Sequence, residues 1–231
     1  MWQRRGGRMR AWTRPGRGGR LGDTLRLSAA SIAAAVLAGT AGYLGIEDQI
    51  RRLGPLPLER AGEASTVVLD RNGDLLRAFT TKDGRWRLPV SHEVVDERYL
   101  DLLIAFEDKR FRYHGGIDWR AFARAGWQLL VNGRIVSGAS TLTMQVARLL
   151  DERHGRAFLT KWRQMLRAVQ LERHLGKDEI LDLYLRLAPF GGNLEGVRAA
   201  SLAYFGREPR RLSLGEAALL VALPQSPEGR R

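Results

Sequence analysis

The stretch from Glu107 to Gly116 reads EDKRFRYHGG, and it decides how the rest of the chain is interpreted. Apolar residues recur at helical spacing over residues 96–107, just before it. A helix that continued through the stretch would place Glu107, Phe111 and His114 on one face and would end at the two glycines. That combination is unusual for a core. The alternative is a solvated Glu-Asp pair beside a core phenylalanine and a hydrogen-bonded structural histidine.

A second stretch, from Ser137 to Gln145, reads SGASTLTMQ and is followed by Arg148. Ser140 follows a glycine-bearing loop and is predicted to be a helix N-cap, so that Thr141, Gln145 and Arg148 share one helix face. A helix N-terminus with hydroxyl groups and an arginine suits an anionic, oxygen-rich group such as a sugar pyrophosphate. Taken alone, the pattern fits an ordinary capped helix equally well.

The order of these stretches resembles that of a known family. Glu107 to Gly116 matches E-D-x-x-F-x-x-H-x-G, and Gly138 to Gln145 matches G-x-S-T-x-T-x-Q. Lys177 to Tyr184 matches K-x-x-I-L-x-x-Y, and Gly196 to Gly206 matches G-x-x-A-A-x-x-x-Y-F-G. The sequence resembles the glycosyltransferase family 51 domain of class A penicillin-binding proteins and is most similar to the 1C branch. The resemblance covers roughly residues 60–227, and chance agreement over so many ordered motifs is negligible.

The resemblance implies a mainly α, lysozyme-like glycosyltransferase domain that catalyses inverting glycosyl transfer. In this reaction, the 4-hydroxyl of an incoming lipid-linked disaccharide, lipid II, attacks the anomeric carbon of the growing glycan strand. The polyprenyl pyrophosphate of that strand then leaves. Glu107 would be the catalytic base, a role that suits a carboxylate in a partly desolvated cleft. Asp108, Phe111 and His114 would shape the acceptor side and orient Glu107.

The resemblance also implies which residues hold the leaving group. Lys161 and Arg148 would bind the pyrophosphate and stabilise the charge that develops on it. Thr141 and Gln145 would act as neutral donors, with Ser140 beside them.

One motif departs from the family pattern R-K-x-x-E. Lys161 keeps its lysine, but Thr160 replaces the arginine, and Gln164 stands at the position of the family's second carboxylate. By itself, this pair would indicate a solvated helix face. A glutamine can donate a hydrogen bond to pyrophosphate but binds a divalent ion weakly. We therefore predict no definite cofactor and no metal ligands, and assistance by a divalent cation such as Mg²⁺ stays open. Arg186 replaces a further family residue, an asparagine.

The N-terminal part differs in composition from the rest. Residues 1–26 hold eight arginines against Asp23, a net +7 of the total +13 among 231 residues. Residues 27–46 carry no charge and have the length of a membrane-spanning helix. The arginines predict a cytoplasmic tail, a single span of the bacterial cytoplasmic membrane and a catalytic domain on the outer, periplasmic side. A cleaved signal peptide is the alternative. Cysteine is absent, which excludes disulfides and a cysteine nucleophile.

The remaining chain divides into two parts. We assign residues 47–90 to a linker and a small β appendage, because Arg71-Asn72-Gly73 separates two short apolar runs and predicts a hairpin within residues 66–79. Helical periodicity fills residues 91–227, the predicted glycosyltransferase domain, with windows at 120–131, 140–150, 161–175 and 178–187. Ser213 and Glu216 form a capping-box pattern for a last helix that Pro224 ends. The fold class is thus mainly α with a small β appendage and one N-terminal transmembrane helix.

Other functions remain open at this point. A muramidase-like enzyme could use Glu107 as an acid, although it would have no pyrophosphate for the cations to bind. A low-activity membrane scaffold for other cell-wall synthesis proteins is a second alternative, motivated by Gln164. Nucleic acid is not expected as a partner, because half of the positive charge belongs to the short N-terminal tail. The motifs S-x-x-K, S-x-N and K-T-G of a transpeptidase domain do not occur, so we expect that domain to be absent from these residues.

Overall fold

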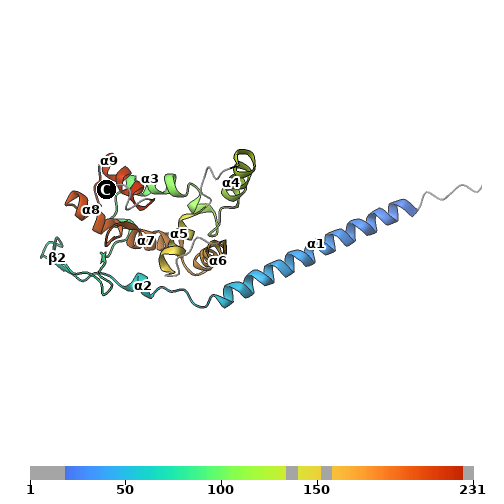
Figure 1. Cartoon of the computed structure of the whole chain (residues 1–231), viewed down its shortest axis with the longest axis horizontal. Coiled ribbons are helices and arrows are strands. Elements are labelled where there is room, and N and C mark those ends of the chain that lie inside the picture. The colour runs from blue at the N-terminus through green and yellow to red at the C-terminus, as the bar shows by residue number, and fades with distance from the viewer. Residues whose placement is uncertain (1–18, 134–139, 152–157, 226–231) are drawn as a thin grey trace, which may run out of the picture. The chain divides into compact units, whose positions relative to one another are not determined.

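The computed structural model of the chain describes residues 19–133, 140–151 and 158–225 (Figure 1). The chain divides into two compact units, residues 1–49 and 50–231. Helix α1, Gly19–Arg52, supplies the described part of the first unit and confirms that residues 27–46 are helical. Within the part of the chain that the structure describes, no helix combines the length and the apolar character that crossing a membrane requires.

The second unit begins with a short helix and a hairpin. Helix α2 spans Glu59–Gly62, and strands β1 (Val67–Leu69) and β2 (Leu75–Ala78) pair antiparallel, as predicted. The turn forms because the Asp70 carboxylate accepts hydrogen bonds from the backbone N–H groups of Asn72 and Asp74, at 2.7 and 2.9 Å.

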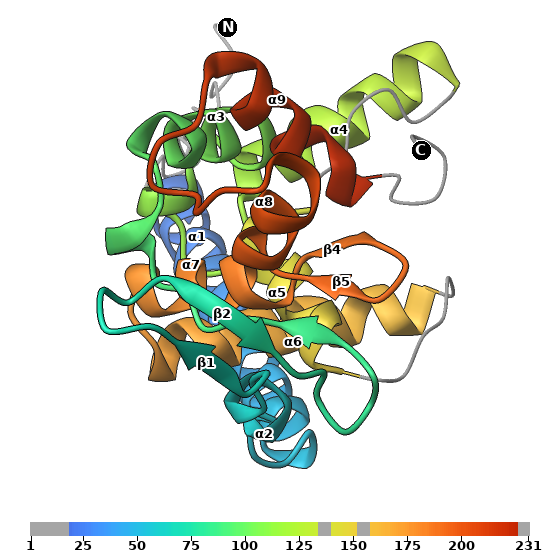
Figure 2. The ribbon, with the colours of Figure 1, turned by 90° about the vertical axis from the view of Figure 1, so that its left-hand side faces the viewer.

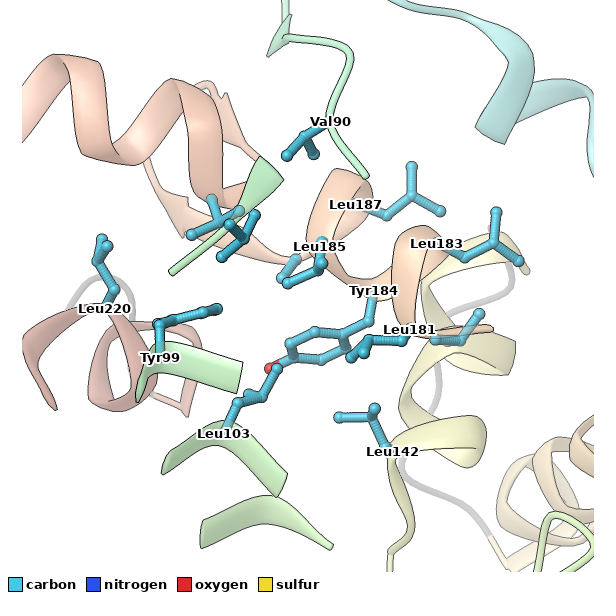
Figure 3. Close-up of a cluster of buried hydrophobic side chains, with 14 of the residues drawn as sticks. Val90, Tyr99, Leu103, Leu142, Leu181, Leu183, Tyr184, Leu185, Leu187 and Leu220 are labelled. Atoms are coloured by element: carbon cyan, nitrogen blue, oxygen red, sulfur yellow. The ribbon is translucent and has the colours of Figure 1, made fainter. Parts of the chain in front are cut away.

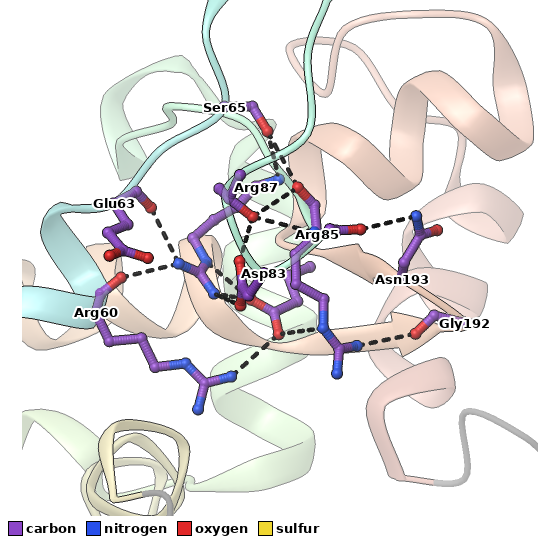
Figure 4. Close-up of polar contacts among 11 residues, drawn as sticks. Arg60, Glu63, Ser65, Asp83, Arg85, Arg87, Gly192 and Asn193 are labelled. Atoms are coloured by element: carbon purple, nitrogen blue, oxygen red, sulfur yellow. Dashed lines mark hydrogen bonds and ion pairs between the residues drawn. The ribbon is translucent and has the colours of Figure 1, made fainter.

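A second small sheet joins residues far apart in sequence. Strand β3 (Trp86–Arg87) pairs in parallel with β5 (Leu194–Glu195), which pairs antiparallel with β4 (Pro189–Gly191). The Arg87 side chain is fully buried, and its Nε donates to Glu195 Oε2 at 2.8 Å. Its Nη1 also donates to the carbonyls of Arg60 and Glu63, at 3.0 and 3.1 Å (Figure 4). This ion pair fastens the segment after α2 to the helical part of the unit.

Helices make up most of the second unit. Their bounds are α3 Glu97–Glu107, α4 Trp119–Asn132, α5 Leu142–Leu150, α6 Phe158–His174, α7 Lys177–Leu187, α8 Val197–Phe205 and α9 Leu214–Ala222. Short 3₁₀ turns, η1 His92–Val94, η2 Phe111–Tyr113 and η3 Leu223–Gln225, complete it. The predicted helical windows are confirmed. So is the last helix, which begins after the reciprocal Ser213–Glu216 capping box and ends before Pro224.

Helix α7 lies at the centre of the core. Its residues Leu181, Tyr184 and Leu185 are at most 1% exposed. They face Leu103 of α3 and Leu142 at the start of α5 (Figure 3). Helix α5 packs against α6 and α7, and α3 packs against α9 (Figure 2). A smaller apolar cluster of Ile117, Met144, Met165 and Ala168 joins α5 to α6, and the helices surround the main cluster. Burial of this cluster fixes the ends of α3, α5, α6 and α9, from which the candidate site is built.

Candidate active site

Glu107 is the last residue of α3, and the helix does not continue beyond it. Asp108 has φ −158° and ψ 79°, which is not helical, and the 3₁₀ turn η2 follows. The predicted helical stripe of Glu107, Phe111 and His114 is therefore wrong. The reason is a tertiary contact: Asp108 turns its side chain inward instead of extending the helix.

Asp108 holds the loop of residues 108–116 against the start of α5. Its Oδ2 accepts hydrogen bonds from His114 Nε2 at 2.8 Å and from the backbone N–H of Leu142 at 2.9 Å. The Gly116 N–H donates to His114 Nδ1 at 3.2 Å, which assigns the ring proton to Nε2. Asp108 and His114 are both buried, so these bonds compensate the loss of their hydration.

Helix α5 begins at Thr141, which corrects the prediction of Ser140 as its N-cap. Thr141 Oγ1 accepts from the Met144 N–H at 3.1 Å and donates to the Gly116 carbonyl at 2.6 Å. Gly116 has φ +93°, and a Cβ atom there would lie 2.7 Å from the Ala168 carbonyl oxygen of α6. The loop of residues 108–116 therefore lies so close to the α6 backbone that only glycine fits at position 116.

Phe111 and His114 lie in the core beneath the site. Phe111 is fully buried, and Lys177 Nζ at the start of α7 lies 4.6 Å from its ring centroid. The same ammonium donates to the His114 carbonyl and to Glu172 Oε1, each at 2.6 Å. Because Phe111 and His114 line neither pocket described below, they support the loop from within.

A pocket of about 330 Å³ opens beside Glu107, and we call it the cationic pocket. Its lining residues come from α3, α5, α6 and η3: Glu107, Ser140, Met144, Gln145, Arg148, Lys161, Gln164, Pro224 and Gln225. Lys161 Nζ donates to Ser140 Oγ. Burial, together with the nearby Arg148 charge, lowers the pKa of Lys161. Among the described residues, neither cation forms an ion pair with a carboxylate.

A second pocket, of about 480 Å³, lies on the other side of Glu107 and is called the α4 pocket. Its lining residues are Phe106, Glu107, Asp108, Lys109, Arg110, Asp118, Ala121, Arg124, Ser140 and Thr141. Glu107 and Ser140 line both pockets. A further pocket of about 560 Å³ touches α6 at Arg163 and Arg167, but it contains none of the predicted site residues. Glu107 thus lines two pockets at once.

Two amide side chains hold the Glu107 carboxylate. Gln145 Nε2 donates to Oε2 at 2.7 Å, and Gln225 Nε2 donates to Oε1 at 3.0 Å. Each oxygen keeps a free lone pair, because a carboxylate offers about four acceptor sites. The group can therefore accept a proton from a hydroxyl placed in either pocket.

Residues 72–231 match the sequence model of a family described as transglycosylase. The chain belongs to the transglycosylase family. It is 53% identical to penicillin-binding protein 1C of Escherichia coli, over 76% of this chain and 23% of that protein. Penicillin-binding protein 1F of Bacillus subtilis is 37% identical over 71% of the chain and 22% of that protein. Penicillin-binding protein 1A of Pseudomonas aeruginosa is 38% identical over 69% of the chain and 19% of that protein. The chain spans about a fifth of the length of these relatives.

These matches confirm the resemblance read from the motifs, and the domain is a glycosyltransferase of the class A penicillin-binding protein type. The transglycosylase brings Glu107, Ser140 and Gln145 together with Arg148, Lys161 and Gln164 around one pocket. Asp108 and Thr141 line the α4 pocket, with their polar groups engaged on the loop. Gly138 of the second motif lies outside the described residues.

Sequence reasoning missed three residues of this transglycosylase site. Gln225 contacts Glu107, from which it lies 118 positions away in sequence, and the surrounding Pro-Gln-Ser pattern does not predict that contact. Lys177 begins the motif K-x-x-I-L-x-x-Y, but the sequence predicted no role for it. Asp118 was also missed, although an aspartate before a helical window is a recognisable N-cap signal: its Oδ1 accepts from the N–H groups of Arg120 and Ala121, at 3.0 and 3.2 Å.

The donor set of the cationic pocket does not fit a resident divalent cation. Glu107 is the only carboxylate among its lining residues, both of its oxygens accept from amides, and two cations share the pocket. In the described part of the chain, no cluster of three or more histidine, aspartate or glutamate side chains is suited to a metal ion. The positive charges of Lys161 and Arg148 would repel a divalent cation placed beside this carboxylate.

Proposed function

We propose that this transglycosylase domain polymerises lipid II into glycan strands by inverting transfer, with release of polyprenyl pyrophosphate. The observation that carries the proposal is that Glu107 lines both the pocket that contains Lys161 and Arg148 and the α4 pocket. The helical architecture is the one expected of a lysozyme-like glycosyltransferase domain. The substrate assignment follows from the family and from this charge arrangement.

The reaction needs a base on one side and cations on the other. The 4-hydroxyl of the incoming lipid II, in the α4 pocket, gives its proton to Glu107 as its oxygen attacks the anomeric carbon. The bond from that carbon to the pyrophosphate of the growing strand breaks at the same time, with inversion. Lys161 and Arg148 stabilise the negative charge that develops on the leaving pyrophosphate, because they lie in the cationic pocket without carboxylate partners among the described residues. Gln164 is available there as a neutral donor.

We assign supporting roles to several residues that the sequence suggested as substrate contacts. Asp108 and His114 fix the loop that follows the base. Phe111 packs beneath that loop against Lys177. The Thr141 hydroxyl caps α5 and binds the Gly116 carbonyl, so it acts through structure. Ser140 lines both pockets and accepts a hydrogen bond from the Lys161 ammonium.

We also propose that residues 27–46 anchor the chain in the bacterial cytoplasmic membrane, with residues 1–26 in the cytoplasm. The charge-free sequence between arginine-rich and polar flanks supports this assignment. A lipid-linked substrate favours a domain at the membrane surface. Helix α4 exposes Trp119, Trp127 and Leu130, which are 65, 68 and 81% exposed and suited to contact with lipid.

The substitution Glu107→Gln tests the proposed reaction, because it removes the proton acceptor with almost no change of shape. We expect the initial rate of glycan polymerisation from purified lipid II by the detergent-solubilised chain to fall by roughly a hundredfold or more. The matched control is Glu97→Gln, an exposed carboxylate on the same helix that lines neither pocket. Its rate should equal that of the unaltered chain.

Full activity of Glu107→Gln would refute the proposed mechanism. Release of soluble sugar from preformed glycan, in place of polymerisation, would instead indicate a muramidase-like enzyme. No polymerisation by the unaltered chain, under conditions in which a related glycosyltransferase works, would favour the scaffold interpretation.

The topology is tested separately by reporter fusion. A reporter attached after Arg231 should be active only outside the cytoplasm. Activity confined to the cytoplasm would contradict the proposed orientation.

A further inference from the structure

The last described turn of the chain reaches the proposed catalytic base. Gln225 Nε2 donates to Glu107 Oε1 at 3.0 Å, while Gln145 Nε2 donates to Oε2 at 2.7 Å. The two donors come from η3 and α5, elements that are distant in sequence from each other and from α3. One donor on each oxygen fixes both the position and the plane of the carboxylate.

Glu107 needs this support because of its place in the fold. It is the last residue of α3, and the backbone leaves helical geometry at Asp108. The side chain is partly exposed between two pockets, so packing does not select one of its rotamers. Without the amides, the carboxylate could turn toward the Lys161 and Arg148 charges in the same pocket, away from the hydroxyl that it must deprotonate.

The chemical type of the donors also matters. A lysine or arginine donor would form an ion pair with the carboxylate and make it a weaker base. A neutral amide donates one hydrogen bond to each oxygen, orients the group and leaves lone pairs for the proton. The two glutamines therefore orient the base without forming an ion pair with it.

Gln225 is held in place by the packing of the helix before it. Helix α9 packs against α3, the helix that carries Glu107. Leu223 of η3 is buried in the core, and Pro224 lines the cationic pocket next to Gln225. The amide therefore reaches Glu107 from an element that is rigidly tied to the helix of its acceptor.

We propose that Gln225 is a positioning residue for Glu107, and that with Gln145 it forms an amide clamp that sets the orientation of the base. This inference rests on the proposed role of Glu107. It assigns the turn η3, which follows α9, a role in catalysis in addition to its packing against the core.

The test compares Gln225→Met, which keeps the shape but removes the donor, with Gln225→Glu, which places a second carboxylate beside the first. The control is Gln128→Met on α4, which lines neither pocket. We expect the kcat of polymerisation to fall roughly tenfold in Gln225→Met, with KM unchanged within about twofold. The kcat of Gln225→Glu should fall further, because the two like charges repel and turn the Glu107 carboxylate away from the hydroxyl.

A second readout does not depend on activity. At one pH, the NMR signal of the Glu107 side-chain carboxyl carbon, assigned by its absence in Glu107→Gln, should change position in Gln225→Met and keep its position in the Gln128→Met control. Inactivity of the unaltered chain would refute the proposed function but leave this readout able to support the clamp. An unchanged Glu107 signal in Gln225→Met would overturn the clamp. A rate loss accompanied by a raised KM and a lower Tm would also overturn it and leave Gln225 a structural role.

Discussion

At the scale of single residues, the cationic pocket is defined by two positive side chains that have no carboxylate partner among the described residues. Lys161 and Arg148 lie close enough that the Arg148 charge, after burial, lowers the pKa of the Lys161 ammonium. Two like charges held together cost folding free energy, and an anionic ligand relieves that cost. The arrangement is therefore suited to binding an anion such as a pyrophosphate.

The lowered pKa of Lys161 predicts a pH effect on activity. A lysine must be protonated to stabilise the leaving group, so the rate should fall as the pH rises through this lowered pKa, before an ordinary lysine would titrate. Lys161→Arg keeps its charge, and its alkaline limb should move to higher pH. Lys161→Ala should lose roughly 2 to 4 kcal/mol of transition-state stabilisation at every pH. Initial polymerisation rates from about pH 7 to pH 11 measure both effects. An identical alkaline limb in Lys161→Arg would assign that limb to another group.

Gln164 offers a second prediction at this scale. Gln164→Glu places a carboxylate in the pocket of Lys161 and Arg148, and we expect it to raise the free energy of unfolding by up to about 1 kcal/mol through their attraction. Gln164→Met, which adds no charge, is the control, and urea unfolding is the measurement. A loss of stability in Gln164→Glu would mean that the amide is adapted to its surroundings. Polymerisation that becomes sensitive to a chelator only in this variant would show that the new carboxylate recruits a divalent cation.

At the scale of elements, the site depends on the junction between the loop of residues 108–116 and the start of α5. Two hydrogen bonds cross it, because Asp108 accepts from the Leu142 N–H and Thr141 donates to the Gly116 carbonyl, and Thr141 also caps its own helix. The loop follows the base, and α5 carries Gln145 and Arg148. The junction therefore sets the distance between the base and the cations.

Thr141→Val tests this junction, because it keeps the side-chain shape but removes the hydroxyl. The helix loses its cap, which costs about 1 kcal/mol, and the buried Gly116 carbonyl loses its donor, which costs about 1 to 3 kcal/mol. We expect urea unfolding to report a total loss of about 2 to 4 kcal/mol. Thr141→Ser, which retains the hydroxyl, should lose less. Equal stability of the valine variant and the unaltered chain would show that the cap contributes nothing.

At the scale of the whole molecule, the second unit is held together by contacts between distant parts of the chain. Arg87 and Glu195 lie 108 positions apart and join β3 to β5. A separate arginine on α6, Arg167, donates to the carbonyls of Leu53 and Gly54, at 2.7 and 2.9 Å. The early segments are thus fastened to the helices that carry the site.

Arg87→Met tests the first of these connections. It leaves Glu195, which is 4% exposed, without its main partner, and we expect a loss of about 3 to 5 kcal/mol in the free energy of unfolding. Arg60 and Arg85 still lie 3.3 and 3.7 Å from Glu195 Oε1 in that variant. The double variant Arg87→Met/Glu195→Gln should recover part of the loss, since it removes the buried charge that Arg87 had neutralised. Urea unfolding of the single and double variants gives the coupling energy. A double variant less stable than Arg87→Met alone would contradict this account.

The sequence alone determined the elements and the family. Helical periodicity, the Asn-Gly turn and the Ser213–Glu216 capping box act between residues close in sequence, so local physics was enough to place α4 to α7, the β1–β2 hairpin and the start of α9. The ordered motifs were enough to indicate the family. They also predicted Glu107, Lys161 and Arg148 as site residues, and the three line one pocket.

Only the tertiary structure decided how these elements meet. Ser140 and Thr141 are neighbouring hydroxyl residues of similar capping propensity, and the Gly116 carbonyl, 25 positions away, engages the Thr141 hydroxyl that caps the helix. Helix α3 ends at Glu107 because the Asp108 carboxylate accepts hydrogen bonds from His114 Nε2 and from the Leu142 N–H. Gln225 reaches Glu107 because α9 packs on α3. Each outcome depends on the burial of distant residues together, and such a contact leaves no periodic signal in a single sequence.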